Sequence, residues 1–240
     1  MLNEERYLKQ LPVIGCEGQE KLNRASVLVV GAGGLGSPLL YYLAAAGVGS
    51  ITVMDNDKVT LSNLNRQIIF KTTDVNKLKA PLAATRLSEL NDSINIKPIT
   101  ETLTAENAPN IIKGFDILAL CADNLKTRLI ANAACVRAGI PFVNAGVSGF
   151  SGTLTTVIPG ETACLSCIYG SAGNNPANNG AILGATAGCV AGMQAMAVIR
   201  CLTGIDEPSA GNLLIFDGEF MSLRHVPIKR DQNCAVCSVK

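Results

Sequence analysis

Aromatic residues, histidine and net charge are all scarce in this chain. It has no tryptophan and one histidine, and 4% of its residues are aromatic. Charged residues make up 16%, and 20 Lys and Arg against 19 Asp and Glu leave a formal net charge of +1. Because basic residues are not in excess, we expect neither nucleic acid nor an anionic membrane as a partner. The single histidine, His225, lies in a strand-like run and is expected to be structural.

Signals for secretion and for disulfide bonding are missing as well. Residues 1–10 are polar and charged, unlike a signal peptide. The nine cysteines are an odd number, spread through alternating strand and helix patterns, so a disulfide scaffold is not expected. Residues 180–199 form an uncharged stretch of 20 residues, about the length of a membrane span. They are mostly Ala and Gly, however, and contain Gln194. We therefore expect a helix of the core or of a subunit interface, and a cytoplasmic protein.

A glycine-rich turn between a buried strand and a helix is the most informative feature that is present. Residues 27–30 predict a parallel strand, and residues 51–54 predict a second strand that ends at Asp55. Between them, before a helix at 39–46, lies a G-x-G-x-x-G turn whose glycines are Gly31, Gly33, Gly34 and Gly36. The first glycine of this pattern permits a tight turn, the second lets the backbone approach a phosphate, and the last lets the helix pack on the strand. With Asp55 able to bind ribose hydroxyls, the pattern predicts a nucleotide site, although NAD-dependent enzymes carry the same signature.

Polar side chains follow the predicted strands at their carboxyl ends. Asp55 and Asp57 follow the second strand, and the run 62–67 comes next, with Asn63, Arg66 and Gln67. Lys79 begins a helix, and Asp123 and Asn124 follow a buried strand at 115–121. Ligands of open α/β sheets bind at these ends, so the groups can converge there. Two cations suit a triphosphate and a spare carboxylate suits its magnesium, although a lysine on a helix is often only solvated and such an aspartate often caps the next helix.

Two C-x-x-C pairs form the second constellation, with the cysteines Cys164, Cys167, Cys234 and Cys237. Four thiolates with this spacing match tetrahedral zinc with no position left for water, so the predicted metal is structural. It would tie the loop after Ile158 to the end of the chain. A single pair would have suggested redox chemistry instead. The other cysteines lie mostly in apolar contexts and are expected to be inert: Cys16, Cys121, Cys135, Cys189 and Cys201.

The order of elements predicts an α/β fold, a Rossmann-like, doubly wound and mostly parallel sheet with an antiparallel C-terminal extension and a zinc site. Because no linker separates the parts, we expect a single domain over residues 1–240. Its parts are N-terminal helices in residues 1–25, a nucleotide-binding half in 26–145 and a zinc-stapled half in 146–240. Short helices are predicted at 3–10 and 17–25, anchored by Leu2, Leu8 and Leu11, and a mobile loop is predicted at 170–180.

Taken together, the motifs resemble one family. The chain contains G-A-G-G-L-G, then D-N-D-x-V-x-L-S-N-L-N-R-Q, K-x-K, C-A-D-N and the paired C-x-x-C, over nearly its whole length. This set is similar to the MoeB/ThiF/HesA adenylyltransferases, the bacterial relatives of ubiquitin-activating enzymes. The resemblance implies a homodimer that uses ATP and magnesium to adenylylate the C-terminal Gly-Gly of a ubiquitin-like sulfur carrier protein of the MoaD or ThiS type. It also implies that Asp55 binds the ribose, that Asn63, Arg66, Gln67 and Lys79 bind the phosphates, that Asp123 binds magnesium, and that the four cysteines bind zinc.

Two positions depart from the family pattern. The N-terminal segment of relatives carries an arginine that reaches across the dimer to the phosphates, and the matching residue here is Lys9. A lysine keeps the charge but loses the planar fork of arginine. Many relatives also carry a cysteine in the loop before the Gly/Ala-rich helix, where Ala177 stands in this chain. We therefore expect no covalent intermediate in that loop, and release of the adenylate to a separate sulfur donor.

Three other functions remain compatible with the residues. One is an ATP-binding relative with weakened catalysis that acts as a binding protein, and another is a peptide-activating adenylyltransferase of the microcin type. The third is an NAD-dependent oxidoreductase, which accounts for residues 26–57 but leaves Arg66, Lys79 and the cysteine pairs unexplained. Molybdopterin and thiamine biosynthesis use near-identical machinery, so the sequence does not indicate the pathway.

Overall fold

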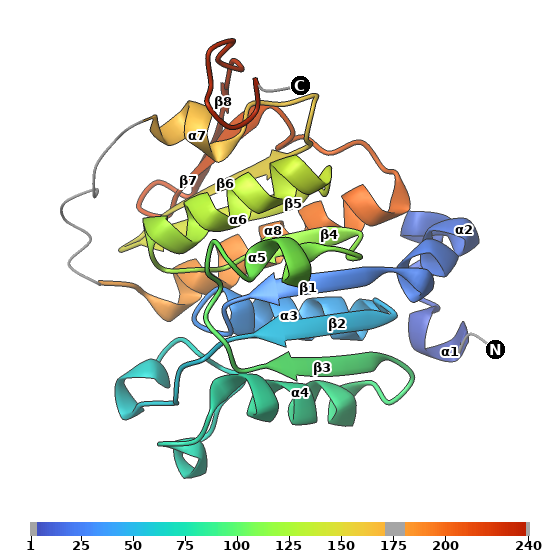
Figure 1. Ribbon diagram of the computed structural model, residues 1–240. Helices are drawn as coiled ribbons and strands as arrows, with labels where there is room; N and C mark the ends of the chain where they lie inside the picture. The colour runs from blue at the N-terminus through green and yellow to red at the C-terminus, as the bar shows by residue number, and fades with distance from the viewer. Residues whose placement is uncertain (1–3, 171–180, 239–240) are drawn as a thin grey trace.

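An eight-stranded mixed sheet forms the centre of the computed structural model, which describes residues 4–170 and 181–238 (Figure 1). The strand order is β3-β2-β1-β4-β5-β6-β7-β8. Five strands are parallel, namely β1 (Ser26–Val30), β2 (Ser50–Met54), β3 (Asn95–Ile99), β4 (Ile117–Leu120) and β5 (Phe142–Ser148). Three antiparallel strands extend the sheet, namely β6 (Ser151–Val157), β7 (Asn212–Asp217) and β8 (Ser222–Pro227). The predicted fold class is therefore confirmed.

Helices cover both faces of the sheet, as Figure 1 shows. One face carries α3 (Gly36–Ala46), α4 (Lys79–Leu90) and α8 (Gly184–Thr203), and the other carries α5 (Ala108–Ile112), α6 (Leu125–Ala138) and α7 (Leu165–Tyr169). The core divides accordingly into two apolar clusters, one on each face. The strands β1 and β4 are buried on both faces, which is why they consist of apolar residues without alternation.

The direction of winding reverses between β1 and β4. From β1 the chain proceeds outward to β2 and β3, and it then returns to place β4 and β5 on the other side of β1. Such a reversal leaves a crevice at the carboxyl ends of the central strands, where open α/β sheets bind ligands. The short 3-10 helices η1 (Leu61–Asn63) and η2 (Thr72–Asp74) lie in the connection between β2 and α4, next to this end of the sheet.

The long apolar helix α8 packs on the sheet. Its length and composition alone would allow it to cross a membrane. In the structure it contacts β4, β5 and β6 as well as α2 and α3. Its amide side chain at Gln194 is fully buried and donates hydrogen bonds to the carbonyl oxygens of Leu120 and Val143, at 3.2 and 2.9 Å. The helix α8 is therefore packed in the core of the protein, as we expected from its Ala/Gly-rich sequence and from Gln194.

The N-terminal helices differ from the prediction. They are α1 (Glu4–Tyr7) and α2 (Leu11–Arg24), and α2 contains a kink at Gly15, where φ is 73°. Leu8, expected as an anchor, is 57% exposed, whereas Tyr7 and Leu22 are buried. The Tyr7 hydroxyl accepts a hydrogen bond from the buried amide of Asn91, which fixes the helix to the end of α4. The loop predicted to be mobile falls, from residue 171 onward, outside the described residues, and Ala177 and Leu2 do so too.

The glycine turn brings the start of α3 against the end of β1. Gly31 adopts a φ of 100°, which disfavours any side chain. A Cβ added to Gly36 would lie 1.9 Å from the Gly31 carbonyl oxygen, so only glycine allows this approach. The predicted packing role of Gly36 is thereby confirmed.

We predict that Gly36→Ala lowers the free energy of unfolding by about 1–3 kcal/mol or more, because α3 must move away from β1. Gly188→Ala is the matched control, since a Cβ at this helical position meets nothing within 4 Å. The control should be neutral or stabilising by up to about 1 kcal/mol. Urea unfolding of both variants measures the difference, and equal stability would contradict the steric argument.

Candidate functional site

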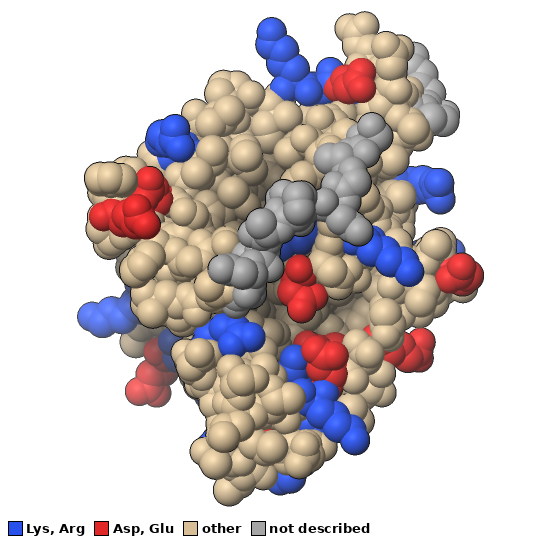
Figure 2. Space-filling model, turned by 90° about the vertical axis from the view of Figure 1, so that its left-hand side faces the viewer, with Lys and Arg blue, Asp and Glu red and all other residues tan. Residues whose placement is uncertain are grey.

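A cleft of about 910 Å³ opens at the carboxyl ends of β1, β2 and β4. Figure 2 looks onto this end of the sheet, where Lys, Arg, Asp and Glu gather around a hollow. Ten of the predicted site residues line the cleft: Gly31, Gly33, Gly34, Asp55, Asp57, Arg66, Gln67, Lys79, Asp123 and Asn124. The structure therefore brings together residues that lie more than ninety positions apart in the sequence.

Arg66 and Gln67 lie directly over the glycine turn. A Cβ at Gly34 would approach the Arg66 Cγ to 3.3 Å, and a Cβ at Gly33 would come 3.6 Å from the Gln67 Nε2. The guanidinium of Arg66 donates through Nη1 to the Ser62 carbonyl and to the Asn65 side chain, at 2.9 and 3.0 Å. Its other N–H groups remain for a ligand, because arginine has five.

The amide of Gln67 indicates a ligand more directly. The residue is 4% exposed, and its Oε1 has no hydrogen-bond partner among the described residues. Buried polar atoms are almost always paired, so an orphaned one beside the glycine turn calls for a partner in the cleft. A ribose or a metal-bound water could supply the missing donor, or the amide could turn its NH₂ group toward a phosphate.

Asp55 connects the glycine turn to β2. Its Oδ2 accepts a hydrogen bond from the Ala32 backbone N–H, and its Oδ1 accepts one from the Asp57 N–H, both at 2.8 Å. Burial raises the pKa of Asp55 above its usual value, and the nearby Lys79 charge and the two N–H groups oppose this shift. Each carboxylate oxygen keeps a lone pair, which can accept a bond from a ribose hydroxyl.

Lys79 is a buried cation on the floor of the cleft. Its side chain is 6% exposed, and its ammonium lies 2.9 Å from the Asp57 carboxylate, which is 63% exposed. One ion pair with an exposed acid uses one of three ammonium protons. The remaining protons point to an anionic ligand as a further partner, since a buried charge needs several compensating contacts.

Asp123 follows β4 and is exposed at the mouth of the cleft. The cap of α6 is formed by its neighbour instead, because the Asn124 Oδ1 accepts the Thr127 N–H at 2.9 Å. Asn124 also donates through Nδ2 to the Asp123 Oδ1, at 3.2 Å. Asp123 is thus not used as a helix cap. Its carboxylate is oriented by the Asn124 amide and lies at the mouth of the cleft, where it could hold a divalent cation.

Three predicted site residues do not line the cleft: Gly36, Asn63 and Lys9. Gly36 serves packing, as described above. The Asn63 Oδ1 accepts a hydrogen bond from the Thr60 N–H at 3.2 Å and so caps η1, which shapes the segment that carries Arg66. Lys9 is exposed between α1 and α2, at the opposite end of the sheet (Figure 1). Within one chain it is remote from the cleft.

The cleft also contains residues that the sequence prediction missed. On its β5–β6 side it is lined by Arg128, Gly146, Thr153 and Tyr169, among others. The available signal was Arg128 itself, since a cation in the first turns of a helix opposes the helix dipole and is expected there only for a specific reason. The only histidine is not at the cleft, because His225 is exposed on β8.

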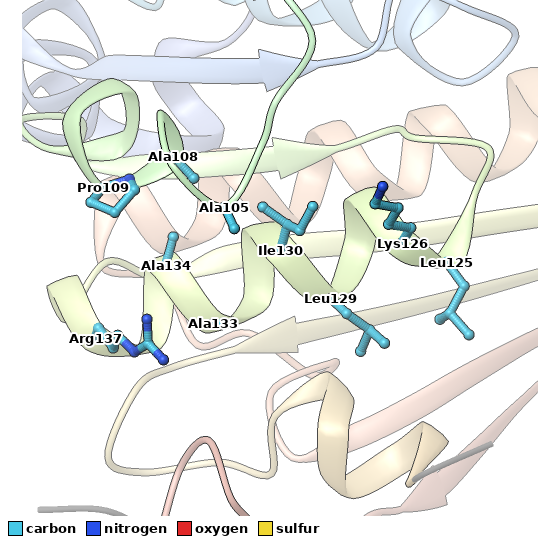
Figure 3. A pocket seen from close by; sticks show the side chains of 10 residues that line it. All are labelled: Ala105, Ala108, Pro109, Leu125, Lys126, Leu129, Ile130, Ala133, Ala134 and Arg137. Atoms are coloured by element: carbon cyan, nitrogen blue, oxygen red, sulfur yellow. The ribbon is translucent and has the colours of Figure 1, made fainter. Parts of the chain in front are cut away.

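A second hollow, of about 630 Å³, lies between α5 and α6 (Figure 3). Small and aliphatic side chains line it, and its charged groups are Lys126 and Arg137. It contains no acid and no nucleophile among its lining residues. The chemistry predicted for the chain therefore belongs to the cleft at the strand ends.

The four cysteines of the two C-x-x-C pairs meet at the end of the sheet that carries α7. Their sulfur atoms all lie within 4.8 Å of one another. The Sγ atoms of Cys164 and Cys234 are 3.7 Å apart, and those of Cys167 and Cys237 are 3.4 Å apart. Tetrahedral zinc with Zn–S bonds of about 2.3 Å requires sulfur–sulfur distances near 3.8 Å. The donor set and the spacing therefore fit a metal ion of the zinc type.

Backbone and side-chain donors surround these sulfurs. The Asp231 N–H donates to the Cys167 Sγ at 3.4 Å, and the Asn132 Nδ2 lies 3.7 Å from the Cys164 Sγ. The Asn132 side chain also accepts a hydrogen bond from the Leu165 N–H at 2.9 Å, and it therefore connects α6 to the first C-x-x-C pair, Cys164 and Cys167. Such outer contacts orient the ligands of metal sites.

The remaining cysteines divide into two groups. Burial raises the pKa of Cys121, Cys135 and Cys201 to about 12, so these thiols are inert, as predicted. Cys16 and Cys189 are exposed, which corrects the expectation of an apolar environment. Both lie on helices, where the face toward solvent is not evident from neighbouring residues alone.

Comparison with protein families matches the ThiF family over residues 5–236. Among characterised relatives, the sulfur carrier protein ThiS adenylyltransferase of Escherichia coli is 37% identical over 97% of this chain and 94% of the relative. The sulfur carrier protein adenylyltransferase of Thermus thermophilus is 38% identical over 97% of this chain and 90% of the relative. The adenylyltransferase and sulfurtransferase MOCS3 of Drosophila ananassae is 39% identical over 98% of this chain, which spans 54% of that longer protein.

Solved structures with a similar fold include the E. coli protein MccB. Its complex with ATP superimposes with a TM-score of 0.87 at 26% identity, over 98% of this chain and 75% of MccB. Its complex with MccA-N7isoASN gives a TM-score of 0.87 at 25% identity, over 99% of this chain and 75% of MccB.

We predict that Cys234→Ser removes the metal. Zinc content should fall from about one ion per chain to below about 0.2, because three thiolates no longer close the tetrahedron. The midpoint of thermal unfolding should fall in parallel, since metal binding contributes to folding. Cys189→Ser is the control and should keep both values, because Cys189 is exposed on α8 and does not belong to the cluster. Full zinc content in Cys234→Ser would contradict the assignment.

Proposed function

The chain belongs to the ThiF family, and from this we propose that it is an adenylyltransferase that uses ATP to activate the C-terminal glycine carboxylate of a ubiquitin-like sulfur carrier protein. The products are the acyl-adenylate and pyrophosphate. The observation that carries the proposal is the cleft, which gathers Lys79, Arg66 and the carboxylates of Asp55 and Asp123 around one glycine turn. The adenylated carrier is then released to a separate protein that donates sulfur to it, in the cytoplasm.

The residues suit the difficulty of this reaction. A carboxylate must attack the α-phosphate although both are anionic, and pyrophosphate must leave with its charge. Lys79 and Arg66 are fixed cations beside the glycine turn and can stabilise that charge as it develops. Asp55 holds the ribose and so sets the position of the α-phosphate. Magnesium, held by Asp123, would supply further neutralisation of the phosphates.

No proton transfer is required for the attack, because the nucleophilic carboxylate is already ionised at neutral pH. This agrees with a cleft that is lined by no histidine. Catalysis then rests on positioning and on electrostatic stabilisation.

We further propose that the carrier docks on residues 146–240, where zinc connects the first C-x-x-C pair, at α7, to the C-terminal segment. The hairpin of β7 and β8 in this half exposes large apolar side chains, namely Phe220, Met221, Leu223 and Val226.

Activation of a peptide is the second candidate. It is favoured by the similarity of the fold to MccB in its complex with a peptide. The relatives that act on sulfur carriers share more of the sequence, at 37–38% identity over most of their own length. We therefore keep the carrier protein as the proposed substrate. The pathway, whether molybdopterin, thiamine or another sulfur-dependent route, follows from the identity of the carrier.

We also propose a homodimer in which Lys9 of one subunit reaches the phosphates of the other. Lys9 is remote from the cleft of its own chain, so it acts only from a partner. The face formed by α2, α3 and α8 exposes the large apolar side chains of Val13, Tyr42 and Met196, which are 78%, 56% and 59% exposed. Such a patch is expected where two subunits meet.

Carrier-dependent exchange of labelled pyrophosphate into ATP tests the activity. Arg66→Ala should lower this rate by about 10²-fold or more, because a cation next to the leaving group is removed. Arg24→Ala is the control and should keep the rate, since Arg24 pairs with Glu20 on the surface of α2. A carrier that lacks its last glycine should give no exchange with any variant. An unchanged exchange rate in Arg66→Ala would contradict the assignment of the cleft as the adenylylation site.

Mixing two inactive variants tests the homodimer. Lys9→Ala and Asp123→Ala should each be strongly impaired alone. Random reassociation forms mixed dimers in which one of the two sites contains both intact residues, so about a quarter of the wild-type rate should return. Two copies of Asp123→Ala that are mixed with each other should regain nothing. Absence of recovery in the mixed sample, with dimers present by sedimentation, would show that Lys9 does not act across the interface.

A further inference from the structure

Arg128 is a partly buried cation on the β5 side of the cleft. Its Nη1 donates to the Asn144 Oδ1 at 2.7 Å, and its Nη2 donates to the Ala122 carbonyl at 2.8 Å. The phenol of Tyr169 interacts with the same guanidinium. Arg128 lies on α6, and these partners come from β5, α7 and the segment after β4, so the tertiary structure holds the guanidinium in one orientation.

None of these partners is a carboxylate. Among the residues that the structure describes, no Asp or Glu forms an ion pair with Arg128 within 4.0 Å, whereas seven other ion pairs are present. Burial lowers the pKa of Arg128, but arginine remains charged at neutral pH. A partly buried cation whose hydrogen-bond partners are neutral is stabilised when an anion completes its environment. The Asp123 carboxylate attracts Arg128 through its charge, but it is exposed and forms no ion pair with the guanidinium, which therefore remains able to bind an anion.

The guanidinium is open toward the cleft because residue 146 has no side chain. A Cβ at Gly146 would lie 3.4 Å from the Arg128 Nη2, 3.5 Å from its Nη1 and 3.2 Å from the Thr153 Oγ1. Of the five N–H groups of the guanidinium, two donate to Asn144 and Ala122 and one bonds to Tyr169, so two remain. Two such donors match the two oxygens of a carboxylate.

The position of Arg128 distinguishes it from the cations that suit the phosphates. Lys79 is paired with Asp57 after β2, whereas Arg128 is bonded to Asn144 in β5. The order β2-β1-β4-β5 puts three strand spacings, roughly 14 Å, between those two places. One phosphate group cannot contact both. The β5–β6 side of the cleft, which also contains Gly146 and Thr153, lies toward the half in which we placed the carrier.

We propose that Arg128 binds the terminal carboxylate of the carrier tail and presents it to the α-phosphate. This inference rests on the proposed function and adds the group that recognises the substrate. One carboxylate oxygen stays bound to the guanidinium, and the other forms the new bond to phosphorus while the bond from that phosphorus to pyrophosphate breaks. The electron pair leaves with pyrophosphate, and no proton moves. Gly146 leaves the space through which the tail reaches Arg128.

The test is a cycle that combines Arg128→Gln with removal of the tail's charge. The probe is the E. coli sulfur carrier protein ThiS, prepared with its free C-terminal carboxylate and, by semisynthesis, as the C-terminal amide. Wild-type enzyme should bind the free acid about 10- to 100-fold more tightly than the amide. Arg128→Gln should bind both forms as wild type binds the amide. Its affinity for a non-hydrolysable ATP analogue should change less than about 2-fold, because the hydrogen bonds of Arg128 go to Asn144 and Ala122 and not to the glycine turn, Lys79 or Arg66.

Gly146→Ala provides a second variant that leaves the bonds of Arg128 to Asn144 and Ala122 in place. It should weaken binding of the free acid and leave the ATP analogue bound as before. Persistent discrimination between acid and amide in Arg128→Gln, or an equal loss of affinity for the ATP analogue, would overturn the proposal. Pyrophosphate exchange by the wild type with the free acid is measured separately. Its absence would contradict the proposed function itself, and with it the substrate on which this inference depends.

Discussion

The approach of α3 to the end of β1 is the constraint on which the cleft depends. The contact exists because Gly36 has no side chain to meet the Gly31 carbonyl oxygen. It sets the N-terminus of α3 at the point where the strand order reverses, and it aligns the turn so that the Ala32 N–H meets the Asp55 carboxylate. Helix N-termini attract anions, so a nucleotide phosphate is the natural ligand at this point. The other cleft residues are placed relative to this turn.

Charge in the cleft is arranged along the sheet. Lys79 and Arg66 lie near the glycine turn, whereas Arg128 lies on the β5 side, where its hydrogen-bond partners are neutral. This separation suits a reaction between two anionic groups, because each is held by its own cations before they meet. The cysteine cluster is connected to the β5 side of the cleft through α6. Asn132, one turn along α6 from Arg128, bonds to Leu165 in the first C-x-x-C pair, so the cysteine cluster and Arg128 are both connected to α6.

Much of the fold could be predicted because its signals are local. Apolar runs such as that of β1, the glycine turn and the paired cysteines each fix their own element, and parallel strands bring their carboxyl ends together without further information. Residues whose roles depend on tertiary contacts were not predictable in this way. Arg128 acquires its meaning from Asn144 and from the missing side chain at Gly146, and Asn63 is used to cap η1. Gly15 has non-helical dihedral angles and divides α2 in two; the part after it matches the helix predicted at 17–25, whereas the turn before it was not predicted.

The central claim is that the triphosphate of ATP lies on the glycine turn, between Lys79, Arg66 and Asp123. A crystal structure with magnesium and a non-hydrolysable ATP analogue tests it most directly. The account predicts ribose hydroxyls on Asp55, phosphate oxygens within hydrogen-bond distance of Lys79 and Arg66, and the metal on Asp123. An analogue bound elsewhere, for example in the hollow between α5 and α6, or phosphates that contact none of these side chains, would contradict it.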